Sequence, residues 1–350
     1  MTPHIQPAEL SFFSIAERLA NLSRQGDPLE RLNGVIDWSW FEPALNQAFP
    51  SVTPKGPGGR PSYPRLLLFR MLILQRLYSL SDEAIQFQVL DRLSFQRFLG
   101  LNMADAVPDQ NTVREFREAL HQADAFTALC ESFRQQLEAQ GLLPKDGVMV
   151  DATFVEVPRQ RNTKEENEQI KGGQTPTTWS EKKAAHKDVD ARWTKKNEDT
   201  FYGYKDHVKV NQVTKFIEAA VVTVASTHDS QVVADLVEAG DVVVFADSAY
   251  TGAQVSEILE ERGVDGCIVQ KGERNHPLNA EDLATNRDIS RVRARVEHPF
   301  AVMSGTAGRI FQRYIGMVRN CGAILLMNLC YNLRRYETVV RLKLYPLMNA

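Results

Sequence analysis

The sequence predicts an α/β protein (α+β overall) in which a mixed sheet flanked by helices follows an all-helical N-terminal domain. Up to Gly141, apolar residues recur at helical spacing between segments rich in Gly and Pro. From Gly147, Val-rich runs typical of buried strands appear and then alternate with helical segments. The chain has 350 residues, which exceeds one typical domain, so we expect two domains at 1–144 and 145–340.

The composition limits the possible partners and location. The formal net charge is −3, so a nucleic-acid partner would have to bind a locally basic region. The four cysteines have no CxxC spacing, which is typical of reduced thiols in a cytoplasmic protein. The N-terminal residues MTPHIQPAELSFF lack the pattern of a signal sequence, and no apolar run is long enough to span a membrane. We therefore expect a cytoplasmic protein without a membrane partner.

Helices are expected throughout the first domain. Ser81 is a suitable N-cap, Gly100 a suitable C-terminal stop, and Pro108-Asp109 a start signal. The helical segments are predicted over residues 8–22, 64–80, 81–100 and 109–140. An aromatic cluster is expected in the core of this domain. Its members are Trp38, Trp40 and Phe41.

A stretch without acidic residues runs from Pro43 to Ser81. It contains a Gly/Pro-rich loop at 53–64, followed by a strongly apolar helix. Its positive charges suit contacts with DNA phosphates, and the Gly-Arg-Pro of the loop suits a minor groove. The alternative is a core helix whose arginines reach the surface. The basic residues of the stretch are Lys55, Arg60, Arg65, Arg70 and Arg76.

The second domain begins with the apolar run 147–157, which we expect to be a strand buried on both faces. Residues 158–200 are polar with nearly balanced charges, and they are expected to form an exposed, solvated insertion. Two alternating segments joined by Asn211-Gln212 then predict a hairpin. The later elements favour right-handed crossovers and a sheet with helices on its faces. They are predicted at 228–240, 242–246, 251–263, 266–270 and 288–304.

Three carboxylates occupy positions where an acid needs an explanation. Asp151 lies in the middle of the apolar strand, where an unpaired ionised group is strongly destabilising. Asp247 directly follows a Val-rich strand, and sites in α/β sheets form at the carboxyl ends of such strands. Glu297 lies in an Arg-rich helical segment, where Pro299 should kink the helix just after the acid. Brought together, the three acids would repel one another and need a divalent cation.

Each acid also has a purely structural explanation. Asp151 could form a salt bridge with Arg293 or Arg295. Asp247 could be an ordinary turn residue, and Glu297 could pair with Arg293 four residues earlier. If the acids share a site, magnesium is the expected ion, because it favours carboxylate oxygens and retains waters. Two such ions would activate a nucleophile and stabilise the leaving oxygen, which favours phosphoryl transfer on DNA.

The sequence around these acids resembles the DDE motif of bacterial insertion-sequence transposases. The motif segments are VDAT around Asp151, FADSAY around Asp247 and RARVEHPF around Glu297. Other segments resemble the family named after insertion sequence five, so that the resemblance covers most of the chain from the Gly/Pro-rich loop onward. These segments are GRPSYP with its following helix, PDQNTVREFREAL, YGYKDHVKV, STHD at 226–229 and NLCYNL at 328–333.

The resemblance implies an RNase H-like catalytic domain and a DNA transposase. Asp151, Asp247 and Glu297 would be the catalytic residues and metal ligands, and they would hold two Mg²⁺ ions, for which Mn²⁺ substitutes. The enzyme would cut double-stranded DNA at the terminal inverted repeats of its element and transfer the 3′-OH ends to target DNA. It would act in the bacterial cytoplasm as a homodimer or higher assembly. The residues expected to contact DNA are Arg60, Arg65, Arg70, Lys205, Arg293 and Arg295.

One signature of the family is only half matched. Relatives carry Tyr-Arg-Glu-Lys on the last catalytic helix; Arg293 and Glu297 match, whereas Ser290 replaces the Tyr and Ser304 the Lys. The family's Lys is associated with DNA near the cut, so this contact is absent unless a nearby arginine supplies it. Two alternatives follow: a catalytically silent DNA-binding protein derived from a transposase, and an RNase H-fold nuclease without strand transfer. The complete acid set argues against the first, and the helical domain with its basic stretch argues against the second.

Overall fold

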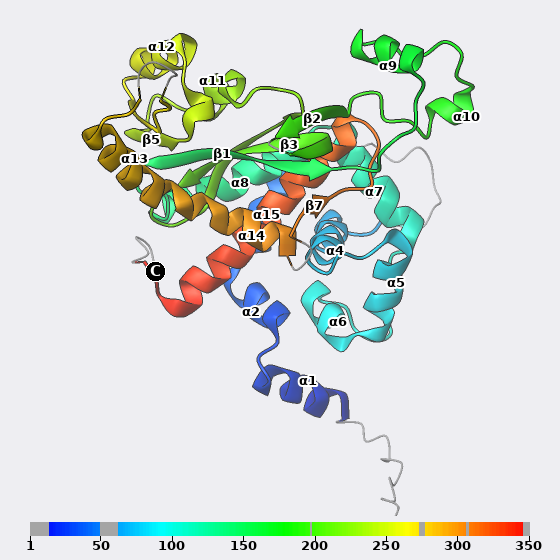
Figure 1. Cartoon of the computed structure of the whole chain (residues 1–350). Coiled ribbons are helices and arrows are strands. Elements are labelled where there is room, and N and C mark those ends of the chain that lie inside the picture. The colour runs from blue at the N-terminus through cyan, green and yellow to red at the C-terminus, as the bar shows by residue number, and fades with distance from the viewer. Residues whose placement is uncertain (1–13, 50–61, 197, 273–276, 306–307, 346–350) are drawn as a thin grey trace, which may run out of the picture. The chain divides into compact units, whose positions relative to one another are not determined.

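The computed structural model describes residues 14–49, 62–196, 198–272, 277–305 and 308–345 (Figure 1). The chain divides into two compact units. The first comprises the described residues within 1–39 and 53–117, and the second those within 40–52 and 118–350. None of the helices in these described ranges combines the length and the apolar character needed to cross a membrane.

The first unit is helical, as predicted. Ser81 caps α5 by accepting a hydrogen bond from the Ala84 amide, and Gly100 ends α6 in the left-handed conformation. Asp109 accepts from the Thr112 amide at the start of α7, so all three predicted helix signals are confirmed. The helices are α1 (Ser14–Arg24), α2 (Pro28–Val35), α4 (Arg65–Leu77), α5 (Asp82–Asp91), α6 (Leu93–Leu99) and α7 (Gln110–Gln122), the last of which continues into the second unit.

The three aromatic residues that were predicted to form one cluster do not lie in one core. Trp38 packs edge-on against Phe98 of α6, with ring centroids 5.4 Å apart, inside the first unit. Trp40 and Phe41 instead pack against Phe133 of α8 (Ala125–Ala139) in the second unit. The boundary between the two units lies within the short 3₁₀ helix η1 (Trp38–Phe41). The closeness of the three aromatic residues in the sequence did not reveal this boundary.

A seven-stranded mixed sheet forms the centre of the second unit. Strand β3 pairs antiparallel with β1 on one side and β4 on the other, while β1 pairs parallel with β5, and β5 with β6. The resulting order β4-β3-β1-β5-β6 is the RNase H-like arrangement that the resemblance implied, and the predicted hairpin is its β3–β4 pair. The strands are β1 (Val148–Glu156), β2 (Arg192–Lys196), β3 (Asp199–Asn211), β4 (Ile217–Val224), β5 (Val243–Ala246), β6 (Asp265–Ile268) and β7 (Ile310–Phe311).

Helices cover both faces of this sheet because alternate residues of β1 are apolar on each side. Val148 and Val150 pack with the apolar residues of α11 and α12, whereas Met149 packs with Val296 and Phe300 on the other face. In Figure 1, α13 runs along the sheet beside β5, in agreement with its contacts. The helical elements are α3 (Glu42–Ala48), η2 (Asp229–Val232), α11 (Val233–Leu236), η3 (Ser248–Tyr250), α12 (Ala253–Arg262), α13 (Ala280–Arg293), η4 (Ala294–Val296), α14 (Glu297–Ser304) and α15 (Met317–Leu342).

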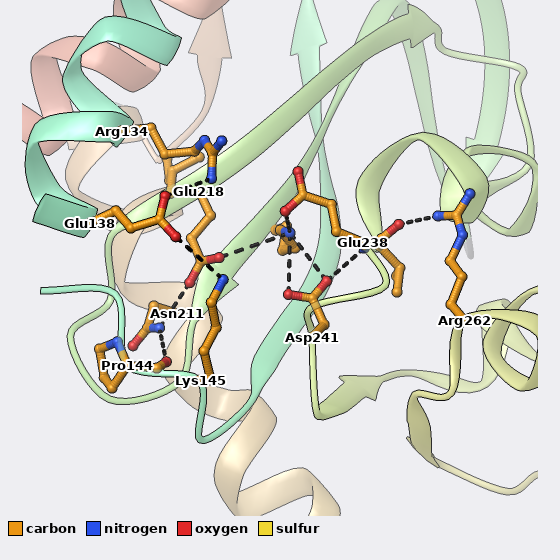
Figure 2. Close-up of polar contacts among 12 residues, drawn as sticks. Arg134, Glu138, Pro144, Lys145, Asn211, Glu218, Glu238, Asp241 and Arg262 are labelled. Carbon is orange, nitrogen blue, oxygen red and sulfur yellow. Dashed lines mark hydrogen bonds and ion pairs between the residues drawn. The ribbon is translucent and has the colours of Figure 1, made fainter. Parts of the chain in front are cut away.

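A buried ionic cluster holds β3 to the chain that leads into β5. The Lys209 side chain is 1% exposed, and its Nζ lies 3.1 Å from carboxylate oxygens of both Glu238 and Asp241. Glu218 approaches the same nitrogen at 3.9 Å. Figure 2 shows these three carboxylates converging on one nitrogen atom. The cation is therefore neutralised by acids from two segments, as a buried charge requires.

The polar segment 158–200 is more ordered than the predicted solvated insertion. It contains α9 (Lys164–Lys171), α10 (Glu181–Ala184) and strand β2. Thr163 and Glu166 form a capping box at the start of α9, and Glu166 also accepts from the Trp179 indole at 2.6 Å. The segment thus contains local capping bonds in addition to its few apolar residues. The nearly balanced charges of its sequence did not predict this order.

Candidate active site

A gap in the pairing of β1 creates the cavity in which the predicted acids meet. On the β5 side, β1 pairs through Val148 and Met149, and farther along it pairs with β7 through Val155 and Glu156. The residues between these two ladders therefore have an edge that no strand of the described residues pairs with on that side. A cavity of about 490 Å³ lies there, and consecutive residues of β1 from Asp151 onward line it. Since neighbouring strand residues point to opposite faces, the cavity follows the strand edge rather than one face.

The three predicted acids line this one cavity although they are far apart in the sequence. Asp151 comes from the middle of β1, Asp247 follows β5, and Glu297 begins α14. Arg293, the last residue of α13, lines the same cavity. Three carboxylates and one guanidinium, from a strand, a turn and two helices, therefore line a single cavity. The prediction of a shared site requires this arrangement.

Asp151 is buried and bound to Arg293. Arg293 Nη1 donates to Asp151 Oδ2 at 2.7 Å, and the Ala152 amide donates to the other carboxylate oxygen at 2.8 Å. The pKa of Asp151 is raised to about 6: burial raises it most, the charge of Arg293 and the Ala152 amide lower it, and the charges of Asp247 and Glu297 raise it. The salt bridge that the sequence left as an alternative is therefore present, together with the two neighbouring acids.

Asp247 combines a turn role with its place at the cavity. It lies directly after β5, where the sheet argument predicted it, and its Oδ1 accepts from the Ala249 amide at 2.8 Å. This bond caps the 3₁₀ helix η3. The ordinary turn role is thus present as well, and it fixes one carboxylate oxygen while the residue still lines the cavity.

The helix break beside Glu297 lies before the acid, not after it. Residues Ala294–Val296 form a 3₁₀ turn between α13 and α14, and Glu297 is the first residue of α14. Pro299 lacks an amide hydrogen for the carbonyl four residues earlier, Arg295, so the α-helical pattern is interrupted upstream. The expected kink just after Glu297 was therefore misplaced. Arg293 donates to Asp151. The alternative in which Arg293 pairs with Glu297 therefore does not explain the position of this arginine.

The chemistry of the cavity fits a divalent cation, but the acids do not form a preassembled metal site. Carboxylate oxygens from three segments are the ligands that Mg²⁺ and Mn²⁺ prefer. The pKa of Asp151 is raised mainly by burial, and the neighbouring charges of Asp247 and Glu297 contribute in the same direction. Among the described residues, however, no three acids, histidines or cysteines are close enough to hold a metal ion as they stand. Arg293 provides the positive charge next to Asp151, so a cation would have to replace or join it.

The three arginines of the helical domain that were predicted to contact DNA differ in their positions and contacts. Arg60 lies outside the described residues, and Arg65 is half-buried at the start of α4. Arg70 lies over the rings of Trp38 and Phe98, and it donates to Asn33 Oδ1 at 2.9 Å. Burial lowers the pKa of Arg70 to about 10. Arg70 therefore has a packing role inside the unit, which is close to the core-helix alternative.

Two predicted DNA contacts in the second unit also differ from each other. Lys205 is largely buried, and its Nζ donates to Asp229 at 2.8 Å and to the Thr227 carbonyl at 2.7 Å. Arg295 is exposed and has a long contact of 3.5 Å to the Gln212 carbonyl. Arg295 is thus free to reach a ligand, whereas Lys205 is bonded within the chain.

The cavity contains further residues that the sequence did not single out. Phe154 and Phe201 stack with centroids 4.1 Å apart and also line the cavity. Lys196 lies over the Phe154 ring and Glu156 lies farther along β1, both at the cavity. Phe154 follows Asp151 by three residues and was visible in the strand run. Lys196 belongs to the polar segment, where nothing distinguished it from its neighbours.

The two serines that depart from the transposase signature lie in different surroundings. Ser304 lines the cavity at the end of α14, and its hydroxyl donates to the Ala301 carbonyl at 3.3 Å. Ser290 is exposed on α13. The place where relatives carry Lys is therefore at the cavity, but here it holds a short neutral side chain.

Comparison with known proteins gives two family matches and one structural match. Residues 143–333 match the family described as a transposase DDE domain, and residues 17–119 match a family described as a transposase domain (DUF772). The chain is also similar to a solved chain described as a piggyBac transposase synaptic complex with hairpin DNA. That likeness has a TM-score of 0.45 and 12% identity, and it covers 90% of this chain and 76% of the other.

Proposed function

The chain belongs to the transposase DDE domain family, and from that premise we propose that it is a DNA transposase. It cuts at the terminal inverted repeats of its insertion sequence and transfers the 3′-OH ends to target DNA. The segments that support placement in the family named after insertion sequence five are GRPSYP with its following helix, PDQNTVREFREAL, YGYKDHVKV, STHD at 226–229 and NLCYNL at 328–333. The observation that carries the proposal is the cavity at the free edge of β1, which Asp151, Asp247 and Glu297 line.

In this proposal Asp151, Asp247 and Glu297 hold Mg²⁺, for which Mn²⁺ substitutes. The bound ions supply a polarised water or 3′-OH and stabilise the leaving oxygen of an in-line displacement. Asp247 keeps its carboxylate oriented through the Ala249 amide, and the fixed start of α14 orients Glu297. No side-chain nucleophile is needed for this chemistry.

Arg293 has two roles in the proposed reaction. Without metal it neutralises the buried Asp151 carboxylate. Its Nε is buried and has no hydrogen-bond partner among the described residues, so the guanidinium retains bonding capacity for a phosphate oxygen. With a cation on Asp151, the Arg293 guanidinium would be available to a phosphate of the DNA backbone. Arg295 is exposed and does not line the cavity, and it is the second candidate DNA contact of this segment.

The proposed division of labour follows the predicted domains. Residues 1–144 bind the element ends, with Arg60, Arg65 and Arg70 as candidate contacts, and residues 145–340 carry out the chemistry. Two ends must be joined in one reaction, so the active species on double-stranded DNA is a homodimer or higher assembly.

A catalytically silent DNA-binding protein is the second candidate. Two observations favour it: Arg293 is bound to Asp151, and Ser304 stands at the cavity where relatives carry Lys. Such a protein would keep the fold and the DNA contacts without cutting. The two candidates differ in one measurable property, which is cleavage at the element boundary.

The deciding experiment uses a labelled duplex that carries the inverted repeats flanking the gene. Wild type and Glu297→Gln are incubated with it in Mg²⁺, and binding is measured in parallel by mobility shift. Nicking at the boundary by wild type alone supports the transposase and the role of Glu297. Binding without cleavage by both proteins supports the silent candidate, and cutting of unrelated duplexes supports a general nuclease.

A further inference from the structure

Lys196 lines the acid cavity although it belongs to the polar segment 158–200, to which the proposed function gives no role. It is the last residue of β2, and successive side chains of a strand point to opposite faces of the sheet. Strand β2 pairs antiparallel with β3, and Thr194 lies opposite Phe201 in that pairing. Lys196 therefore shares a face with Thr194 and Phe201, whereas Lys195 belongs to the other face.

Two stacked aromatic rings hold the Lys196 side chain at this cavity. The Phe154 and Phe201 rings are nearly parallel, with an interplanar angle of 10° and centroids 4.1 Å apart, and both residues line the cavity. Lys196 Nζ lies over the Phe154 ring, 5.9 Å from its centroid. An aromatic face attracts an ammonium without neutralising it, so the rings keep a full positive charge at the cavity.

The positive charge of Lys196 is not taken up by an acid. Arg293 is bonded to Asp151, and Arg309 Nη1 lies 3.7 Å from Glu156 Oε1. Of the cations among the described residues that line the cavity, Lys196 alone has no carboxylate partner. The residue is exposed, so an anion can reach its ammonium from solvent. The cavity thus combines a group of acids with an available cation on an aromatic support.

We propose that Lys196 binds a backbone phosphate of the DNA strand that is cut at the three acids. The inference rests on the proposed function, because it assumes that the acids hold the reacting phosphate through a cation. Phe154 lies three residues along β1 from Asp151, which is about 10 Å of strand. Phosphates of one DNA strand follow one another about every 3.4 Å along the duplex axis. The phosphate bound by Lys196 therefore lies within about three nucleotides of the cut.

This contact assigns a function to the polar segment 158–200. Its strand β2 brings a basic side chain to the cavity at which Ser304 is short and neutral. The stack of Phe154 on Phe201 joins β1 to the start of β3, so the lysine is carried on the sheet and not on a loop. A charge fixed in this way binds phosphate irrespective of the base sequence, which suits a contact beside the cut.

The test compares Lys196→Gln with wild type in binding to the labelled duplex that carries the inverted repeats flanking the gene. Binding is measured in EDTA, so that the DNA stays uncut. We expect the affinity to fall about tenfold at about 50 mM salt, because one phosphate contact is lost. The salt dependence should become shallower by about one phosphate contact, so the difference should shrink about threefold when salt is raised to about 200 mM. Lys196→Arg should keep most of the affinity, because it keeps the charge.

Lys195→Gln is the matched control. It removes the same charge from the neighbouring exposed residue of β2, which does not line the cavity. We expect it to bind like wild type. A series of duplexes, each with one neutral methylphosphonate, locates the contact. Wild type should lose affinity when the neutral group lies within about three nucleotides of the element boundary. Lys196→Gln should lose nothing further at that position.

The outcomes separate this inference from the proposed function. If wild type binds the duplex and cuts it in Mg²⁺, unchanged binding by Lys196→Gln would overturn the inference alone. Equal losses for Lys195→Gln and Lys196→Gln would also overturn it, because net charge would then explain both. A wild-type protein that neither binds nor cuts this duplex would overturn the proposed function and the inference with it.

Discussion

Arg293 donates to Asp151 at 2.7 Å across 142 positions of sequence, and this bond joins the end of α13 to the middle of β1. The positively charged Arg293 guanidinium is therefore paired with the carboxylate that is proposed to bind metal. The pKa of Asp151 is still raised to about 6, because burial and the two neighbouring acids outweigh the arginine. Under the proposed function the bond therefore competes with the metal ion, and it stabilises the metal-free fold.

Arg293→Gln should destabilise the metal-free protein and make it more dependent on metal. Removal of the guanidinium leaves Asp151 buried without its cation, and the partial exposure of the pair limits the cost to about 1–2 kcal/mol. Urea unfolding in EDTA should show this loss, and saturating Mn²⁺ should recover more stability in the variant than in wild type. Arg291→Gln is the control, since that side chain is 77% exposed and should change stability little. Equal losses for both variants would contradict the role assigned to the Arg293–Asp151 bond.

Much of the fold follows from local sequence signals. The caps at Ser81, Gly100 and Asp109 act through bonds to residues within one helical turn, so the sequence contains all that is needed to predict them. Strands β1 and β5 were equally visible, because burial on both faces demands a continuous apolar run. Asp151 stood out for the same reason.

The features that sequence reasoning missed depend on partners that are remote in the chain. Lys205 was expected to face DNA, but Asp229 and Thr227 occupy its ammonium. Arg70 was expected at a DNA surface, but the rings of two aromatic residues surround it. The free edge of β1 exists because β7 pairs only with the far end of that strand. A two-residue strand such as β7 has no periodicity from which its position could be predicted.

Asp206→Asn should change how stability depends on pH. Asp206 is fully buried on β3; Asn328 Nδ2 donates to one carboxylate oxygen at 3.1 Å, while the other oxygen and Asn328 Oδ1 have no partner among the described residues. Burial raises the pKa of Asp206 to about 7 from its ordinary value of 3.8. Between these values the folded protein keeps a proton that the unfolded chain has lost, so wild-type stability falls as pH rises from about 4 to about 7 and levels off above.

The Asn variant should lack that slope. Its amide can donate to Asn328 Oδ1 and accept from Asn328 Nδ2 at any pH, so it should match wild type near pH 4 and be more stable at pH 8 by roughly 2–4 kcal/mol. Urea unfolding at a series of pH values measures the difference. Asp199→Asn, at the exposed start of the same strand, should leave the wild-type slope in place. A variant that is less stable than wild type at pH 8 would show that Asp206 is charged and paired in the fold.

Lys209→Met should be among the most destabilising substitutions in the second unit. It leaves Asp241 and Glu218 buried without their cation, and the cost of such an uncompensated charge is about 3–5 kcal/mol. Burial raises the pKa of Glu218, so the loss should shrink as pH is lowered toward 5 and Glu218 takes up a proton. Lys145→Met is the control: its Nζ lies 3.9 Å from Glu138 in an exposed pair, so it should cost less than about 1 kcal/mol. A similar loss at pH 5 and pH 7 would assign the cost to packing instead of charge.

Ser304→Lys should strengthen DNA binding at the cavity. Ser304 lies seven residues after Glu297 on α14, two helical turns along the same face, and both residues line the cavity. A lysine there would place an ammonium beside the proposed cleavage position, where it can neutralise one more phosphate. We expect a tighter complex with the duplex that carries the element ends, and a salt dependence of binding that is steeper by about one phosphate contact. If the missing Lys is what limits catalysis, the cleavage rate should rise as well.

Val302→Lys is the control, because it adds the same charge to the same helix at a residue that does not line the cavity. Equal gains from both lysines would mean that net charge alone sets the affinity, whereas a gain confined to Ser304→Lys would place the DNA backbone at the end of α14.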